Sequence, residues 1–153
     1  MEHAGAERLL AAVGQQIGIA ELALDDAGCC ALSFDDVVVN FEADAESERL
    51  FLYAEVGDAP EGLAEALYRD ILAANLLWQG TGGATLSLDA AGRRFVLGHA
   101  VPVGRIGEVD FVTTVERFVD IAETWRRRIA ETGPQSAEPI VPLPGIVTPG
   151  MLA

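Results

Sequence analysis

The sequence contains no lysine, so every one of its basic side chains is an arginine. Its 10 basic residues face 24 aspartates and glutamates, which gives a net charge of −14 at neutral pH. A surface this negative repels nucleic-acid phosphates and anionic lipids, so neither nucleic acid nor a membrane is an expected partner. The charge favours a neutral or basic partner, although acidity alone also keeps a sticky protein in solution.

Cysteine and histidine are almost as scarce. The two cysteines are neighbours, Cys29 and Cys30, and adjacent residues of a strand point to opposite faces, so a disulfide framework and a cysteine-rich zinc site are excluded. The two histidines, His3 and His99, do not form the His-x-x-x-His pair of a helical metal site. We therefore expect no metal and no cofactor, and the unpaired cysteines fit a reducing cytoplasm.

Long apolar runs are missing as well. No segment approaches the roughly 20 consecutive apolar residues that a membrane-spanning helix needs. The first apolar stretch, residues 9–13, is short and follows Glu7 and Arg8, unlike the apolar region of a secretory signal. These absences predict a cytoplasmic location.

Catalytic motifs are not found either. The glycine-rich segment 80–83 lacks the Gly-Lys-Ser/Thr ending of a phosphate-binding loop, and a predicted helix precedes it where a dinucleotide fingerprint needs a strand. No Gly-x-Ser-x-Gly elbow is present. The acidic pairs at 25–26 and 35–36 are of a type that serves acid–base chemistry or holds a divalent ion, but each falls in a predicted turn, where aspartate is favoured for backbone reasons. The sequence therefore predicts a protein that is not an enzyme.

Hydrophobic periodicity predicts one α+β domain over residues 1–132, with an antiparallel twisted sheet and helices packed on it. Its order is α-β-β-β-α-β-β-α. The second helix is predicted to open after a cap at Asp58 or Ala59 and to run to Leu77. Its predicted buried stripe is Leu63, Leu67, Ile71 and Leu72. The other two helices are predicted over 4–18 and 107–131, and the strands over 28–34, 37–43, 49–56, 84–89 and 94–101.

The predicted strands carry large apolar side chains on both faces. Val38 lies on the opposite face from its neighbours in the second strand, and Phe51 and Tyr53 do so in the third. A sheet that helices cover on one face usually has a polar open face. The excess indicates that a partner or a second copy covers the open face, unless the helices and the tail together cover both faces.

Residues 133–153 differ in composition from the rest of the chain. They hold most of the seven prolines and no aromatic residue, which predicts an extended or disordered tail outside the domain. The segment 140–147 within it is apolar for a linker, which suggests docking on the domain or on a neighbour.

Several stretches of the sequence resemble a known family. The most specific is Leu72–Leu77 followed by Gly80–Asp89, which is close to that family's usual end of the second helix and start of the fourth strand. Further likeness lies in segments 9–25, 30–41 and 50–54. With the order of elements, the length and the acidity, these stretches resemble the class I chaperones of bacterial type III secretion, the Tir-chaperone (CesT-like) family, over about residues 5–130.

The resemblance implies a homodimer that binds the N-terminal region of a secreted effector in extended form and keeps it competent for export. The alternative is a dimeric adaptor or regulatory protein of the same fold without a secretion client. The predicted effector-binding residues lie between the first helix and the first three strands: Leu9, Val13, Ile17, Leu32, Phe34, Val38, Phe41 and Phe51. The predicted dimer contacts follow the second helix: Leu76, Leu77, Trp78, Leu86 and Leu88.

Overall fold

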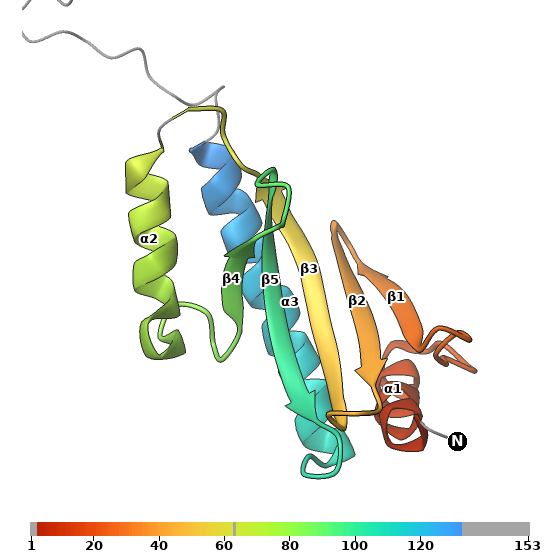
Figure 1. The fold of residues 1–153 in the computed structure, drawn as a ribbon. Helices are drawn as coiled ribbons and strands as arrows, with labels where there is room; N and C mark the ends of the chain where they lie inside the picture. Colours follow the sequence, from red (N-terminus) through yellow and green to blue (C-terminus); the bar gives the residue numbers. More distant parts are fainter. Residues whose placement is uncertain (1–2, 63, 133–153) are drawn as a thin grey trace, which may run out of the picture.

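The computed structural model describes residues 3–62 and 64–132, and the predicted tail over 133–153 lies outside them. The order of elements is the predicted one (Figure 1). No helix of these described residues is both long enough and apolar enough to span a membrane. The elements are α1 (Ala4–Ile17), β1 (Cys29–Phe34), β2 (Val37–Asp44), β3 (Arg49–Asp58), α2 (Glu65–Asn75), a 3-10 turn η1 (Leu76–Trp78), β4 (Thr85–Leu88), β5 (Arg94–Pro102) and α3 (Glu108–Glu131).

The five strands form one antiparallel sheet in the order β1-β2-β3-β5-β4, so β1 and β4 are its edges. Helix α3 runs along one face, across β2 and β3, and α1 packs against α3 (Figure 1). Helix α2 packs beside β4 at the other edge of the sheet. There the rings of Tyr68 on α2 and Phe95 on β5 pack edge to face, with their centres 5.9 Å apart. In the described part of the chain no helix covers the opposite face of the sheet.

Strand alternation decides which side chains enter the core. In β2, Val37, Val39 and Phe41 are fully buried against the helices, whereas Val38 between them is 47% exposed on the open face. In β3, Leu50 and Leu52 are likewise buried. Both faces are thus divided as the alternation predicts, and no helix of the described residues covers the apolar side chains of the open face.

Helix α3 lies close to the sheet because glycines make room for it. Gly57 has φ = 152°, and a Cβ placed there would lie 2.5 Å from the Ile129 Cγ2 atom. Gly82 has φ = 59°, and a Cβ placed there would overlap the Cδ1 atom of Ile121 on α3. Any larger residue at either position forces the helix away from β3 or from the loop before β4.

The predicted boundaries of the second helix are wrong at both ends. Asp58 pairs with Arg94 and the Ala59 N–H donates to the Arg93 carbonyl at 2.7 Å, so this segment continues β3 instead of capping a helix. At the far end, Leu77 and Trp78 adopt φ of 51° and 55°, which ends the α-helix at Asn75 and leaves one 3-10 turn.

Candidate functional site

The outer edge of β1 offers free backbone hydrogen-bonding groups. Opposed residues of an antiparallel pair alternate between hydrogen-bonded and non-bonded pairs, and the two-residue turn after Phe34 makes Phe34–Val37 a bonded pair. Ala31 and Ser33 therefore direct their N–H and C=O groups away from β2. Cys29 has the same orientation, and its carbonyl accepts from the Asp25 N–H at 2.8 Å. No described residue pairs in this way with Ala31 or Ser33.

At the other edge of the sheet, one side chain occupies the outward backbone groups of Leu86 in β4. The Asn75 Nδ2 donates to the Leu86 carbonyl and its Oδ1 accepts from the Leu86 N–H, both at 2.9 Å. These two bonds occupy the backbone groups that Leu86 turns away from β5. Helix α2 also packs along β4. Strand β1 is therefore the more accessible edge for a strand from another chain.

Replacing Asn75 with leucine is expected to lower the free energy of unfolding by about 2 kcal/mol, because it leaves the N–H and C=O of Leu86 without partners in a part-buried place. Urea unfolding followed by circular dichroism measures the change. Asn40→Leu is the control, since the Asn40 amide makes one exposed bond of 3.3 Å to the Tyr53 carbonyl. Equal stabilities of the Asn75 variant and the wild type would show that the edge does not depend on this amide.

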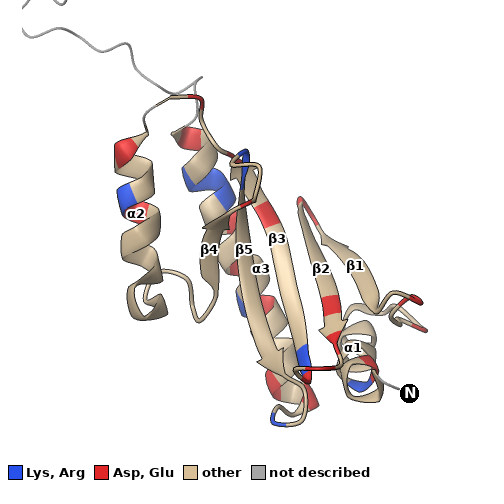
Figure 2. Cartoon of the chain, in the orientation of Figure 1, with Lys and Arg blue, Asp and Glu red and all other residues tan. Residues whose placement is uncertain are grey.

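Strand β1 also carries no charged residue. Figure 2 shows β1 free of acidic and basic positions, whereas the loop that precedes it and the turn after it are acidic. Edge strands that must stay unpaired usually carry charges or proline. The strand reads Cys-Cys-Ala-Leu-Ser-Phe, which places no such barrier in the way of an added strand.

The structure divides the eight predicted effector-binding residues between three places. Ile17 is 40% exposed at the end of α1, and Phe34 is half-buried at the end of β1 on the helix side. Val38 and Phe51 lie on the open face, where Phe51 is half-buried. They do not form one pocket, because alternation sends them to opposite faces. The remaining members are buried in the core: Leu9, Val13, Leu32 and Phe41.

The open face is hollowed next to Phe51. A groove of about 770 Å³ crosses β3, β5 and β4 and is lined by Phe51, Tyr53, Trp78 and Thr85, among others. Its floor includes Gly98, where the missing side chain exposes the backbone. Sequence periodicity placed Phe51 and Tyr53 on this face, but it gave no signal for the approach of Trp78 from the end of η1.

The predicted dimer residues gather at the end of α2 and on β4. Leu77 is 75% exposed, Trp78 is 55% exposed, and Leu76 and Leu88 are exposed as well. Leu86 differs, since its side chain is buried in the core. Leu72 belongs to the patch but was predicted to be buried; it is 71% exposed because it lies a third of a turn from the buried Ile71. We call Leu72, Leu76, Leu77, Trp78 and Leu88 the α2 patch.

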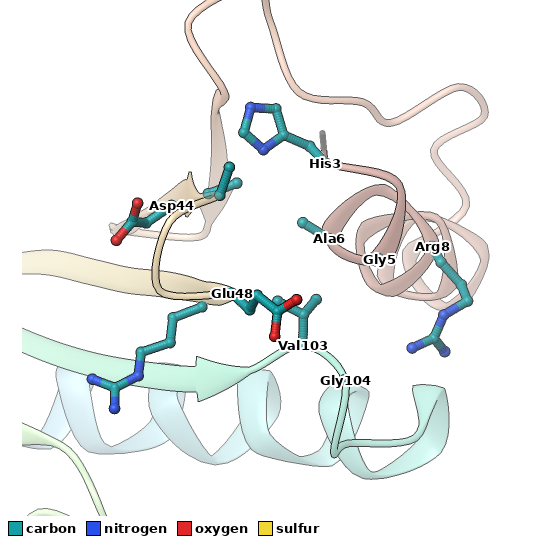
Figure 3. A pocket seen from close by; sticks show the side chains of 11 residues that line it. His3, Gly5, Ala6, Arg8, Asp44, Glu48, Val103 and Gly104 are labelled. Atoms are coloured by element: carbon teal, nitrogen blue, oxygen red, sulfur yellow. The ribbon is translucent and has the colours of Figure 1, made fainter. Parts of the chain in front are cut away.

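A smaller hollow lies where α1 begins, next to the turn between β2 and β3 (Figure 3). Two of its charged groups have partners: Arg8 pairs with Glu108 at 3.2 Å, and Asp44 accepts from the Ser47 hydroxyl at 2.6 Å. That bond is the main reason why the pKa of Asp44 is lowered. In Figure 3 the Arg8 and Asp44 side chains point away from each other, so they do not converge on a ligand.

The cysteine side chains show no sign of activation. Burial, followed by the charge of Asp25, raises the pKa of both the Cys29 and the Cys30 thiol, so both are protonated at neutral pH. Within residues 3–62 and 64–132 no group of three or more His, Cys, Asp or Glu side chains is arranged to hold a metal ion.

Comparison with known proteins gives consistent matches. Residues 8–126 match the family model of the Tir chaperone protein (CesT) family. A Chlamydia pneumoniae protein, CPj0713/CpB0740, is 34% identical over 126 residues, which cover 78% of this chain and 92% of that protein.

Solved structures of similar fold come from complexes. A chain of the ExsC–ExsE complex has a TM-score of 0.67 and 29% identity, and the match covers 81% of this chain and 92% of that one. A chain of the HopA1–SchA chaperone–effector complex has a TM-score of 0.63 and 22% identity, covering 83% and 94%. A chain of the ExoU–SpcU complex from the Pseudomonas aeruginosa type III secretion system has a TM-score of 0.63 and 20% identity, covering 82% and 95%.

The family model spans most of the chain, and the described helices and strands occupy the same range. The predicted resemblance is therefore confirmed: the chain belongs to the Tir chaperone (CesT) family.

Proposed function

We propose that the protein is a chaperone of bacterial type III secretion that holds an N-terminal segment of an effector in extended form in the cytoplasm. The single observation that carries this function is the open, uncharged edge of β1 in a member of a chaperone family. The chaperone–effector complexes among the structures of similar fold support it. The chain works by binding and releasing a polypeptide and catalyses no reaction.

The proposed binding mode is strand addition. An extended client donates to and accepts from the free groups of Ala31 and Ser33, which provides affinity without reading sequence. Alternate client side chains then meet the apolar groups on either side of the edge: Phe34 and Ile17 lie on the helix side, and Val38 lies on the open face. The buried Leu9, Val13, Leu32 and Phe41 support this surface from beneath.

The α2 patch is proposed as the dimer contact. Exposed leucines and a half-exposed tryptophan that gather at the end of α2 and on β4 are typical of a protein interface, and the indole N–H of Trp78 already donates to the Thr85 hydroxyl at 3.2 Å. A homodimer would cover this patch and leave both β1 edges free, since the patch lies at the opposite side of the sheet (Figure 1).

Co-expression with the N-terminal segment of candidate effectors tests the function. Ser33→Pro removes the N–H that points out of the edge without touching the bonds between β1 and β2. We expect it to weaken effector binding about tenfold, the loss that one or two hydrogen bonds represent. Isothermal titration of the purified fragment gives the affinity.

Ser33→Thr is the matched control, because it keeps the outward N–H and a β-branched hydroxyl suits a strand. Its affinity should stay close to that of the wild type. Equal binding by the proline variant would remove the edge from the mechanism. If no effector segment binds to any of the three proteins, the chaperone function itself is wrong, and the alternative of a regulatory protein without a secretion client gains support.

A further inference from the structure

The open edge of β1 raises the question of what covers it before a client arrives. An uncharged edge strand with free N–H and C=O groups is a template for pairing with any extended chain. The groups of Ala31 and Ser33 have no partner among the described residues. The cover that these residues supply is limited to Cys29, whose carbonyl accepts from the Asp25 N–H and whose N–H donates to the Asp25 Oδ1. A protein that persists without its client needs a cover for this edge.

The C-terminal segment 140–147 has the sequence of a strand that can pair on one side only. Pro142 and Pro144 are two positions apart, so in an extended chain both missing N–H groups fall on the same side. The odd positions, Val141, Leu143 and Gly145, keep all of their N–H and C=O groups on the other side. Proline with its nitrogen toward solvent is what an edge strand tolerates, so this segment can end a sheet but cannot be paired further.

The place where α3 ends puts this segment within reach of β1. Asp36, in the turn that follows β1, lines the same hollow as Arg126, Arg127 and Ala130 in the last turns of α3. The eight steps along the chain from Thr132 to Ile140 span about 26 Å when extended, whereas the six residues of β1 extend about 20 Å. Because β1 ends at this turn, a segment that enters here runs antiparallel to it.

Charge also favours this occupant. The described domain is strongly acidic, and β1 is flanked by acidic turns (Figure 2). Segment 140–147 has no charged side chain, so it meets no repulsion, and its apolar residues suit the apolar groups beside β1.

We propose that residues 140–147 add to β1 as a sixth, antiparallel strand in the client-free protein, and that an effector segment displaces them. The segment then acts as a built-in competitor that protects the edge. The docking of the segment is independent of the client, whereas its role as a competitor rests on the proposed function.

Hydrogen exchange of the Ala31 and Ser33 amides in the full-length, client-free protein tests the docking. In the wild type these two amides should exchange about tenfold more slowly than free amides. Protection of this size means that the segment is docked in about nine tenths of the molecules. Leu143→Pro removes an N–H on the pairing side and should abolish this protection. Ile146→Pro is the matched control, since it adds a proline on the side that already carries Pro142 and Pro144, and it should keep the protection.

The outcomes separate the two hypotheses. Equal exchange of Ala31 and Ser33 in all three proteins overturns the docking of the segment, whatever the client does. If docking is found, an effector fragment should bind the Leu143→Pro variant about tenfold more tightly than the wild type or the Ile146→Pro variant, because the competitor is gone. Docking together with equal affinities overturns the role as a competitor, and docking together with no effector binding overturns the proposed function alone.

Discussion

Replacing Trp78 with aspartate is expected to convert the proposed homodimer into a monomer. Trp78 lies in the α2 patch beside Leu77 and is 55% exposed in the single chain, so a second copy would bury most of its ring. A carboxylate in its place would be desolvated without a partner, and a twofold interface carries the change twice. We expect the dissociation constant to rise at least about a hundredfold, which corresponds to roughly 3 kcal/mol.

Sedimentation equilibrium measures the change in mass. Val109→Asp is the matched control, because Val109 is 80% exposed at the start of α3, outside the α2 patch, and receives the same new charge. The control should remain a dimer with an unchanged circular dichroism spectrum. If the wild type has the mass of a dimer and the Trp78 variant keeps it, another surface forms the dimer; if the wild type has the mass of a monomer, the proposed homodimer is wrong.

Replacing Trp125 with alanine is expected to cost about 4 kcal/mol of unfolding free energy, near the upper end for a core substitution. Trp125 is the largest fully buried side chain of the described residues and lies on α3. Its Nε1 donates to the Gly80 carbonyl at 3.1 Å, which ties α3 to the loop before β4, and the Arg128 guanidinium lies 4.7 Å from the ring centre. Alanine removes the packing, the hydrogen bond and the cation–π contact together.

Trp125→Phe separates these contributions. Phenylalanine fills most of the ring volume but leaves the Gly80 carbonyl without its donor, so a loss of about 1–2 kcal/mol is expected. Urea unfolding of both variants gives the two free energies. If phenylalanine costs as much as alanine, the hydrogen bond and not the packing is the main contribution. If alanine leaves the stability unchanged, Trp125 is not part of the cooperative core.

Much of the fold could be predicted because its signals are local. The alternation of Val37, Val38 and Val39 assigns the two faces of β2 without knowledge of any partner, and the same reasoning separates Leu50 from Phe51 in β3. The spacing of apolar residues likewise predicts α3 to within a residue of its observed start. The family resemblance rests on such local patterns and is confirmed over residues 8–126.

The boundaries of α2 could not be predicted in the same way. Pro60 and its neighbours suit the start of a helix, yet Asp58 remains in β3 because Arg94, far away in the sequence, pairs with it. Likewise Leu72 follows helical spacing as well as Ile71 does, and only the packing of α2 against β4 decides which of the two is buried.

The absence of lysine, of paired cysteines and of catalytic motifs, together with the periodicity, predicted from sequence alone an acidic α+β protein with apolar residues on both faces of its sheet. The resemblance of several segments added the family. The tertiary structure decided which edge of that sheet is open. Asn75 occupies the outward N–H and C=O of Leu86 in β4, where α2 also packs, and no described residue does the same for Ala31 and Ser33 of β1. The reason is physical: periodicity depends on neighbours along the chain, whereas the pairing of an edge depends on residues that only folding brings together.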